Sequence, residues 1–375
     1  MDVYIREAKS IPDLHAFVNF ANELYKDNPC WVPFPFPAEI DVLKSNRNPA
    51  FGQCEARYFL AYRGDRIVGR VAAILNHEHI RKWGQQYMRF GWMEFIDDRE
   101  VSRALIKAVE DWAKERGMKA VHGPLGFTDF DRSGFMVEGF QELGTLVASY
   151  TQPYYPQHMD KLGYHKDIDW IEHEIIVPDK VDQTIAERAE QILKNNHLHI
   201  LRPKSKRELL RYALPVFNVM NEYFRHSYAI VPFNKDISRS YIKHFFLFLK
   251  PDFAPIILDN NNKVVAFTIC FPSFSRALQQ GGGKISGKSF YQLVKAGQIN
   301  DRADLYLHGV TDEYAGKGIA VVLMNTLIEN FIKHGIKKVE SNPELEADPR
   351  IRIQWNAFEK RQHKRRRAYI RQFAE

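Results

Sequence analysis

Apolar and polar positions alternate along the chain in two similar series, one in each half. In the first half, apolar residues at 59–62 and 67–72 flank Gly64-Asp65, and in the second half those at 256–258 and 264–267 flank three asparagines. Gly, Asn and Asp tolerate the positive φ of a tight turn, so each pair of runs predicts a β-hairpin. A helix-like apolar spacing precedes each hairpin, at Leu14, Phe17, Ala21 and Leu24 and at Leu210, Leu214, Phe217 and Met220.

Short matching segments link the two series. Asn-Glu at 22–23 precedes Val-Pro-Phe at 32–34, and the same two motifs recur at 221–222 and 231–233. Gly-x-Lys-x-Val then marks the end of a helix and the start of a strand at 117–121 and again at 335–339. The wider spacing in the second copy predicts an insertion at residues 272–301. Each copy reads strand, helices, hairpin, strand, helix, strand, which predicts a mixed α/β fold in two domains, 1–180 and 181–375.

A glycine-containing turn distinguishes the second copy. A predicted strand at 305–310 leads into Ala315-Gly316-Lys317-Gly318, and a predicted helix follows at 319–334. Helix N-termini expose unpaired N–H groups and a partial positive charge, and glycine lets the backbone approach an anion closely. The turn therefore predicts a pyrophosphate site. It lacks the Gly-Lys-Ser/Thr of a P-loop and the third glycine of a dinucleotide fingerprint, and the alternative is an ordinary strand-to-helix turn.

These residues resemble motif A of the GNAT superfamily, the acyl-CoA-dependent N-acyltransferases, which reads Gln/Arg-x-x-Gly-x-Gly/Ala. Gly318 and Ala320 match the last two places, whereas Ala315 stands where Gln or Arg is usual. The resemblance implies an α/β (α+β) fold of two tandem GNAT-like domains, each a mixed, mostly antiparallel sheet flanked by helices. It also implies an acyl-CoA site formed by Val310, Ala315, Gly316, Lys317, Gly318, Ile319 and Ala320, with the Val310 N–H as oxyanion donor.

The first copy has no glycine at the matching place, residues 95–101. Asp97 and Glu100 there are spaced as a helix capping box. Two carboxylates at this point repel a pyrophosphate, so we expect the first domain to be non-catalytic and the second to hold acyl-CoA.

Two residues are candidates for the base that takes the proton of the attacking amine. His308 lies on the strand before the glycine turn, and its alternative role is that of a structural, hydrogen-bonded histidine. Glu340 follows the next predicted strand, where the resemblance implies an acidic lining of the acceptor cleft. Glu222 and Tyr223 are weaker candidates for the border of that cleft. Residues 351–360 contain no tyrosine to serve as the general acid that the resemblance implies.

Composition excludes several other chemistries. The three cysteines are widely spaced, which argues against disulfides and thiolate metal sites and favours a reducing cytoplasm. No metal is expected. The His77–His79 segment lacks the spacing of a zinc site. The loop at 127–134 has acidic residues like a calcium loop, but the twelfth position counted from Asp129 is Phe140, where a calcium loop needs Glu. No apolar run is long enough to cross a membrane.

The net charge is +7, and the densest basic run is residues 360–367. Such a run is usually solvated surface, and it could also attract the 3′-phosphate of CoA or an anionic membrane. Without interleaved aromatic residues it does not favour nucleic acid as a partner.

The resemblance implies an acyl-CoA-dependent N-acyltransferase acting on a small-molecule or lipid amine. The chain is similar to bacterial tandem GNAT proteins linked to N-acylation of sphingoid bases, so we expect a cytoplasmic protein that contacts the inner membrane face peripherally. Two alternatives remain: a GNAT-like module that binds CoA or lipid without turnover, and a tRNA-dependent aminoacyltransferase of the tandem-GNAT type.

Overall fold

The computed structural model describes residues 2–203, 205–246, 248–350 and 358–374. The strands of the first half are β1 (Val3–Glu7), β2 (Cys54–Arg63), β3 (Arg66–Asn76), β4 (Tyr87–Phe95), β5 (Ala120–Gly123), β6 (Phe135–Glu138) and β7 (His165–Ile176). Its helices are α1 (Ile11–Leu24), α2 (Phe36–Leu43), α3 (His77–Trp83), α4 (Arg99–Glu115) and α5 (Tyr155–Lys161).

The second half repeats this plan. Its strands are β8 (His199–Ile200), β9 (Ile256–Leu258), β10 (Val264–Pro272), β11 (Arg302–Val310), β12 (Lys338–Glu340), β13 (Glu344–Leu345) and β14 (Lys360–Gln372). Its helices are α6 (Gln183–Asn195), α7 (Lys206–Tyr223), α8 (Lys235–Phe245), α9 (Ser275–Gly281), α10 (Gly287–Gln298) and α11 (Ile319–Lys333). Both predicted hairpins are confirmed as β2–β3 and β9–β10.

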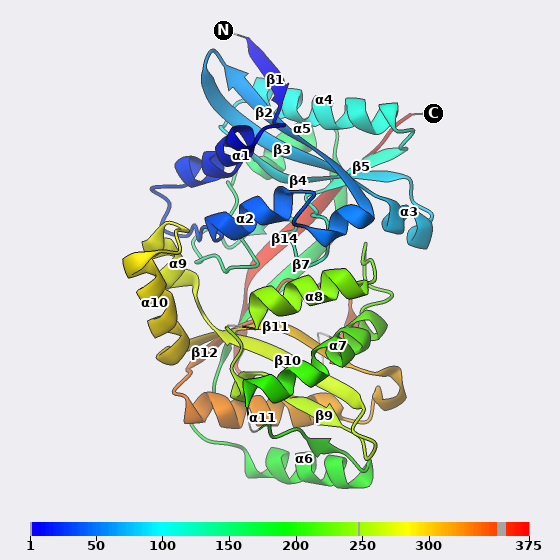
Figure 1. Ribbon diagram of the computed structural model, residues 1–375, viewed down its shortest axis with the longest axis vertical. Helices are drawn as coiled ribbons and strands as arrows, with labels where there is room; N and C mark the ends of the chain where they lie inside the picture. The colour runs from blue at the N-terminus through cyan, green and yellow to red at the C-terminus, as the bar shows by residue number, and fades with distance from the viewer. Residues whose placement is uncertain (1, 204, 247, 351–357, 375) are drawn as a thin grey trace.

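The described strands form one continuous sheet through both halves, in the order β1-β2-β3-β4-β5-β14-β7-β12-β11-β10-β9-β8, and helices flank it (Figure 1). The strands pair antiparallel except at β4–β5 and β11–β12. The predicted mixed, mostly antiparallel α/β fold is therefore confirmed.

The two halves exchange their last long strands. β7 of the first half pairs with β12 of the second, and β14 of the second half pairs with β5 of the first. β7 and β14 also pair with each other, from Lys360 opposite Ile175 to Ile370 opposite His165. The division into two domains at residue 180 remains a prediction. Strands from either side of this division pair with each other in the sheet.

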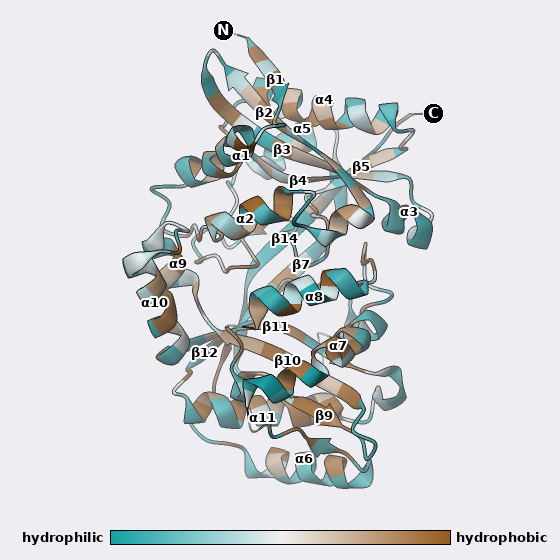
Figure 2. Cartoon of the chain, viewed as in Figure 1, coloured by the Kyte–Doolittle hydropathy of each residue, from teal (hydrophilic) through white to brown (hydrophobic). Residues whose placement is uncertain are grey.

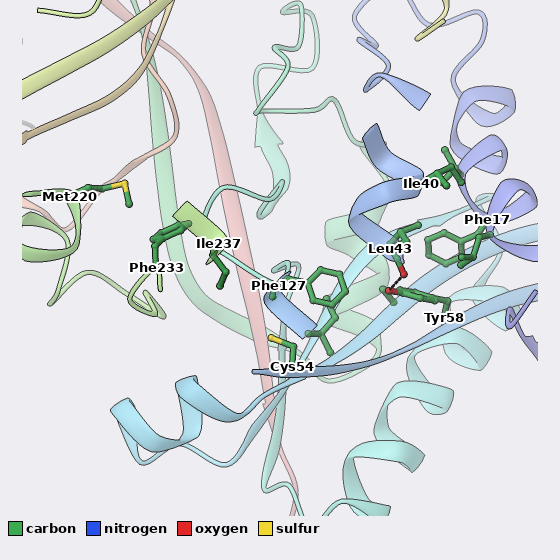
Figure 3. Packing of buried hydrophobic residues seen from close by; sticks show 14 of the residues in the cluster. Phe17, Ile40, Leu43, Cys54, Tyr58, Phe127, Met220, Phe233 and Ile237 are labelled. Carbon is green, nitrogen blue, oxygen red and sulfur yellow. Dashed lines mark hydrogen bonds between the residues drawn. The ribbon is translucent and has the colours of Figure 1, made fainter. Parts of the chain in front are cut away.

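Side chains from both halves share one apolar core. Figure 3 shows the cluster extending from Phe17 and Leu43 through Phe127 to Phe233 and Met220. The repeated Asn-Glu motif also has a structural reason in the second half: the Asn221 side chain accepts from the Phe233 N–H at 2.9 Å and donates to its carbonyl at 3.0 Å. This clamp holds the loop after α7 against the core that both halves share.

The basic run at 360–367 lies within β14, and its interpretation as solvated surface holds only in part, because Arg361 is exposed but the middle of the run is buried. Lys364 and Arg366 are buried, and both contact Glu172 of β7, at 3.0 Å and 2.5 Å. Burial opposes the charge of Lys364, but the carboxylates of Glu172 and Glu340 outweigh it and raise the pKa of the ammonium. Acidic residues of β7 thus neutralise the middle of the run within the sheet.

The structure also shows what the predicted insertion contains and which residue caps α4. The predicted insertion at 272–301 contains α9 and α10, where the first half has only the short α3 among its described residues. The cap of α4 is Asp98, whose side chain accepts from the Glu100 N–H at 2.8 Å, and not Asp97 as predicted. None of the described helices is long and apolar enough to cross a bilayer.

Candidate active site

A gap opens beside β11 at the point where the resemblance places the thioester. β12 ends at Glu340, opposite Asp304, so among the described residues no strand pairs with β11 on this side beyond Asp304. The next contact there is the Asn342 side chain, which donates to the Tyr306 carbonyl. Thr311 N–H donates to Val265 O, which puts Val310 in a non-hydrogen-bonded pair with Ala266. The Val310 N–H therefore points away from β10 and toward the gap, as an oxyanion donor must.

The glycine turn adopts the conformation that an anion cradle needs. Gly316 and Gly318 have φ of 75° and 79°, and Gly318 caps the N-terminus of α11. Among the described residues, no acceptor binds the N–H groups of Gly316, Gly318, Ile319 or Ala320. These four free donors at one helix start fit a diphosphate.

The side chains of the turn add little to this cradle. Ala315, Gly316 and Lys317 are exposed, and the Lys317 ammonium lies 4.8 Å from the Tyr314 ring centroid. Ile319 is buried against α6 and β10, so only its backbone is available to a ligand. Recognition of a pyrophosphate here would depend on main-chain groups.

A cavity of about 330 Å³ lies beside the gap, between the sheet of the second half and α7 and α8. Its lining is mostly apolar and aromatic and includes Phe217, Met220, Phe245, Phe267, Phe271 and Tyr306. The first half closes one side with Leu125, Phe130, Val147 and Trp170. Both halves therefore build one apolar chamber next to the predicted thioester position.

His308 lies in the wall of this cavity and is paired with Tyr223, the last residue of α7. The Tyr223 hydroxyl is 2.9 Å from His308 Nε2, and His308 Nδ1 is buried without a partner among the described residues. Burial, with a smaller effect of the Arg350 cation, lowers the pKa of His308 to about 4. Burial also raises the pKa of Tyr223 to about 12. Both groups are therefore neutral at pH 7.

Arg350 fixes the outer side of this pair. Its guanidinium lies 4.2 Å from the centroid of the Tyr223 ring and donates to the Tyr223 carbonyl at 3.2 Å. Arg350 is itself ion-paired with Asp348, which lines the cavity. The ring and the main chain of Tyr223 are thus held by Arg350, while its hydroxyl contacts His308.

Glu340, the second predicted base, lies elsewhere. Its carboxylate is 2.5 Å from the buried Lys364 ammonium and 2.7 Å from His363 Nε2. It is not among the described residues that line the cavity. The structure therefore brings His308 and Val310 to the gap and leaves Glu340 in the ion-pair network of β14. Its catalytic role stays a prediction.

Two carboxyl groups in the cavity wall were missed as site residues. Asp129 and Asp131 flank Phe130 in the loop between β5 and β6, and burial raises the pKa of each to about 6. Asp129 Oδ2 accepts from the Val231 N–H at 3.2 Å. Their spacing suggested only a calcium loop. Nothing in the local sequence indicates that they line a cavity whose other walls come mostly from the second half.

The corresponding place in the first half is closed. The Asp98 carboxylate caps the start of α4 and also pairs with Arg63 at 2.8 Å. Asp97 contacts His158 of α5 at 2.9 Å. A small cavity of about 40 Å³ lies beside β4, lined by Arg70, Glu94 and other polar residues. This helix start offers an anion a carboxylate instead of free N–H groups.

Residues 351–357, most of the segment expected to carry a general acid, lie outside the described residues. Among the residues that the structure does describe, no group of three or more His, Cys, Asp or Glu is placed to hold a metal ion.

The architecture matches solved acetyltransferases. A tandem GNAT protein from the clavulanic acid biosynthesis pathway superposes with a TM-score of 0.56 over 100% of this chain and 99% of that one, at 14% identity. The glucosamine N-acetyltransferase region of a fungal multi-domain β-N-acetylglucosaminidase gives 0.59 over 98% of this chain and 38% of that one, also at 14% identity. The chain therefore has the tandem GNAT fold, and the resemblance is confirmed at the level of the fold.

No family model matches the chain, and the two sequence relatives described here are less than 30% identical to it. Protein YghO of Escherichia coli strain K12 is 26% identical over 372 residues, which is 96% of this chain and 93% of that protein. Bacterial ceramide synthase of Caulobacter vibrioides is 28% identical over 169 residues, less than half of either chain, at 45% and 44%.

Proposed function

We propose that the protein is a cytoplasmic, acyl-CoA-dependent N-acyltransferase whose active site lies in the second half of the chain. One observation carries the proposal: four free N–H groups at the start of α11, the inward N–H of Val310 and an apolar cavity follow one another along the same edge of β11. A CoA thioester laid along this edge would have its diphosphate on the cradle, its carbonyl oxygen at Val310 and its acyl carbon at the cavity.

The reaction requires a neutral amine nitrogen, so a bound ammonium must first release one proton to solvent. The nitrogen then attacks the thioester carbon, the carbon–sulfur bond breaks and the nitrogen loses a second proton. His308 is neutral near pH 7, so it can accept a proton. With the hydrogen on Nε2, it donates to Tyr223 and leaves the Nδ1 lone pair free. Tyr223 keeps its proton to high pH and is the donor nearest this histidine, so we assign it as the acid for the departing thiolate.

The cavity favours an acceptor amine with an apolar chain. Its wall is aromatic and aliphatic, which excludes a strongly hydrated substrate, while Asp129 and Asp131 provide carboxyl groups for an ammonium. The partial similarity to bacterial ceramide synthase supports a lipid amine of the sphingoid type. We therefore propose that the second substrate is a long-chain amine.

The decisive experiment combines a panel of acyl-CoA donors, from acetyl to palmitoyl, with amines that differ in chain length, and follows thiol release. We expect release only with an amine present, and faster release with long-chain amines than with short polar ones. Mass spectrometry of the product should show an amide. Failure of every donor and amine pair to release thiol would contradict the proposal.

One observation favours a second function. Ala315 replaces the Gln or Arg of the family motif, which removes a side-chain contact to the cofactor. A module that binds CoA without turnover would show this departure and still keep the free N–H groups. Calorimetry distinguishes the two, because such a module binds CoA but releases no thiol in the panel above.

A further inference from the structure

The insertion between β10 and β11 presents an apolar face to solvent. On α10, Phe290, Tyr291 and Val294 have exposed fractions of 56%, 68% and 42%. These positions are i, i+1 and i+4, so they form one face of the helix. Ile285 before the helix and Ile299 after it are exposed as well, at 39% and 75%. Five large exposed apolar residues therefore lie within residues 285–299. This stretch contains α10, which is at the left margin of the molecule in Figure 2.

Apart from Asp301 at its end, the charged residues of the same segment are all cations. Between Asp259 and Asp301 the chain contains no Asp or Glu, but it contains five cations, of which four belong to the insertion: Arg276, Lys284, Lys288 and Lys295. The three lysines are exposed, and among the described residues none of these four cations forms an ion pair. On the helix, Lys288 and Lys295 border the apolar face. This contrasts with β14, where the basic residues are matched by acids of β7.

The opposite face of α10 packs over the cavity wall. Leu293 is buried in a cluster with Phe271, and Tyr306 and Phe245, which also line the cavity, pack against that cluster. The element is also anchored to the first half, because Gln279 of α9 donates to the carbonyls of Pro29 and Trp31. The exposed face is thus on an element whose other side packs against residues of the cavity wall.

We propose that the face formed by Ile285, Phe290, Tyr291, Val294 and Ile299 inserts into the interface of a membrane that contains anionic lipid, with Lys284, Lys288 and Lys295 at the headgroups. An amphipathic helix with apolar and aromatic residues flanked by lysines is the arrangement that binds in the plane of a bilayer. Unpaired cations without a single carboxylate complement an anionic surface. Docking here brings the cavity wall next to the lipid phase, and it requires no catalytic activity.

The test is binding of the full chain to vesicles of phosphatidylcholine alone and of phosphatidylcholine with phosphatidylglycerol, measured by co-sedimentation. We expect binding to the anionic vesicles that weakens as salt is added. The triple variant K284S/K288S/K295S should bind about 100-fold more weakly, which corresponds to about 1 kcal/mol per charge. Its matched control is K26S/K180S/K194S, which removes three exposed lysines elsewhere and should bind like the parent.

The apolar contribution is tested separately. The double variant F290S/Y291S should lose about tenfold or more in affinity, whereas Y4S/L210S, which changes two exposed apolar residues elsewhere, should not. All three native cysteines are buried, so a dye on F290C would report this position selectively, and its emission should shift to the blue on vesicles. Undiminished binding of F290S/Y291S, equal losses in the two lysine variants, or an unshifted dye would overturn the proposal.

Discussion

The hydroxyl of Tyr223 and the imidazole of His308 form a hydrogen bond of 2.9 Å between two elements that are distant in sequence, the end of α7 and the middle of β11. The bond joins the two groups of the second half best placed to move protons next to the gap. His308 was predicted as a base from its place on the strand, whereas its partner was only a weak candidate for the cleft border.

We expect replacement of either residue to slow the chemical step. His308→Gln and Tyr223→Phe should each lower kcat by about 10²–10⁴-fold, because general acid–base catalysis contributes on this scale. Binding of CoA, measured by calorimetry, should stay unchanged in both. Tyr212→Phe, on the same helix, is the matched control for loss of a hydroxyl. A variant at His308 with full kcat would show that this residue is structural.

The pH dependence separates His308 from the two aspartates. With a pKa of about 4, His308 is already neutral at pH 5 and contributes no inflection above it. Asp129 and Asp131, with pKa values of about 6, become negative as the pH rises through 6 and then attract the ammonium of the acceptor. We therefore expect kcat/KM for the amine to rise across pH 6.

Asp129→Asn and Asp131→Asn test this assignment. The rise near pH 6 should shrink in these variants and persist in Asp27→Asn, which changes an exposed carboxylate far from the cavity. A rise that persists in the double variant Asp129→Asn with Asp131→Asn would show that neither group binds the amine.

A carboxylate in the cradle should abolish CoA binding. Gly318→Glu places a negative charge at the start of α11, and we expect no measurable heat with CoA. Gly318 has positive φ and its Cβ would meet Ile192 at 2.9 Å, so Gly318→Gln controls for backbone strain and bulk. Gly335→Glu, at φ of 72° with open space around it, controls for charge elsewhere. Unchanged CoA affinity in Gly318→Glu would remove the assignment of the cofactor site.

The buried ion pairs of β14 should be costly to break. Glu172→Gln leaves Lys364 and Arg366 without their shared carboxylate in a buried position. We expect the free energy of unfolding to fall by about 3–5 kcal/mol, measured by urea denaturation. Lys107→Ala removes an exposed pair with Asp111 on α4 and should cost about 0.5 kcal/mol or less. Equal losses in the two variants would contradict the assignment.

The sequence predicted well those features that depend on local chemistry. Asn and Gly at the turns identified the hairpins. Gly316 and Gly318 identified a helix start whose N–H groups have no acceptor among the described residues. The start of α4 was also predicted, although the capping residue is Asp98 and not its neighbour. In each case the responsible residues lie within a few positions of the feature they form.

Features that depend on distant partners were missed. The basic run at 360–367 has no local sign that acids of β7, almost two hundred residues earlier, would pair with it inside the sheet. Asp129 and Asp131 line a cavity whose other walls come from the second half. Within β11, the alternation of faces that a regular strand would give is also absent, because the register against β10 shifts near Tyr306 and residues 305–308 all line the cavity.

Because β7 and β14 are exchanged, the first half, which we expect to be non-catalytic, cannot be removed without disrupting the sheet of the second half. A fragment ending near residue 180 would carry β7 without either of its sheet neighbours, β14 and β12, and would leave β5 with an open edge. The remaining fragment would carry β14 without β5 and β7, and would leave β12 with an open edge. We therefore expect neither fragment to be active on its own. The cavity can form only when the two fragments associate and their exchanged strands pair. Activity should therefore reappear only when separately produced halves are mixed and form this complex.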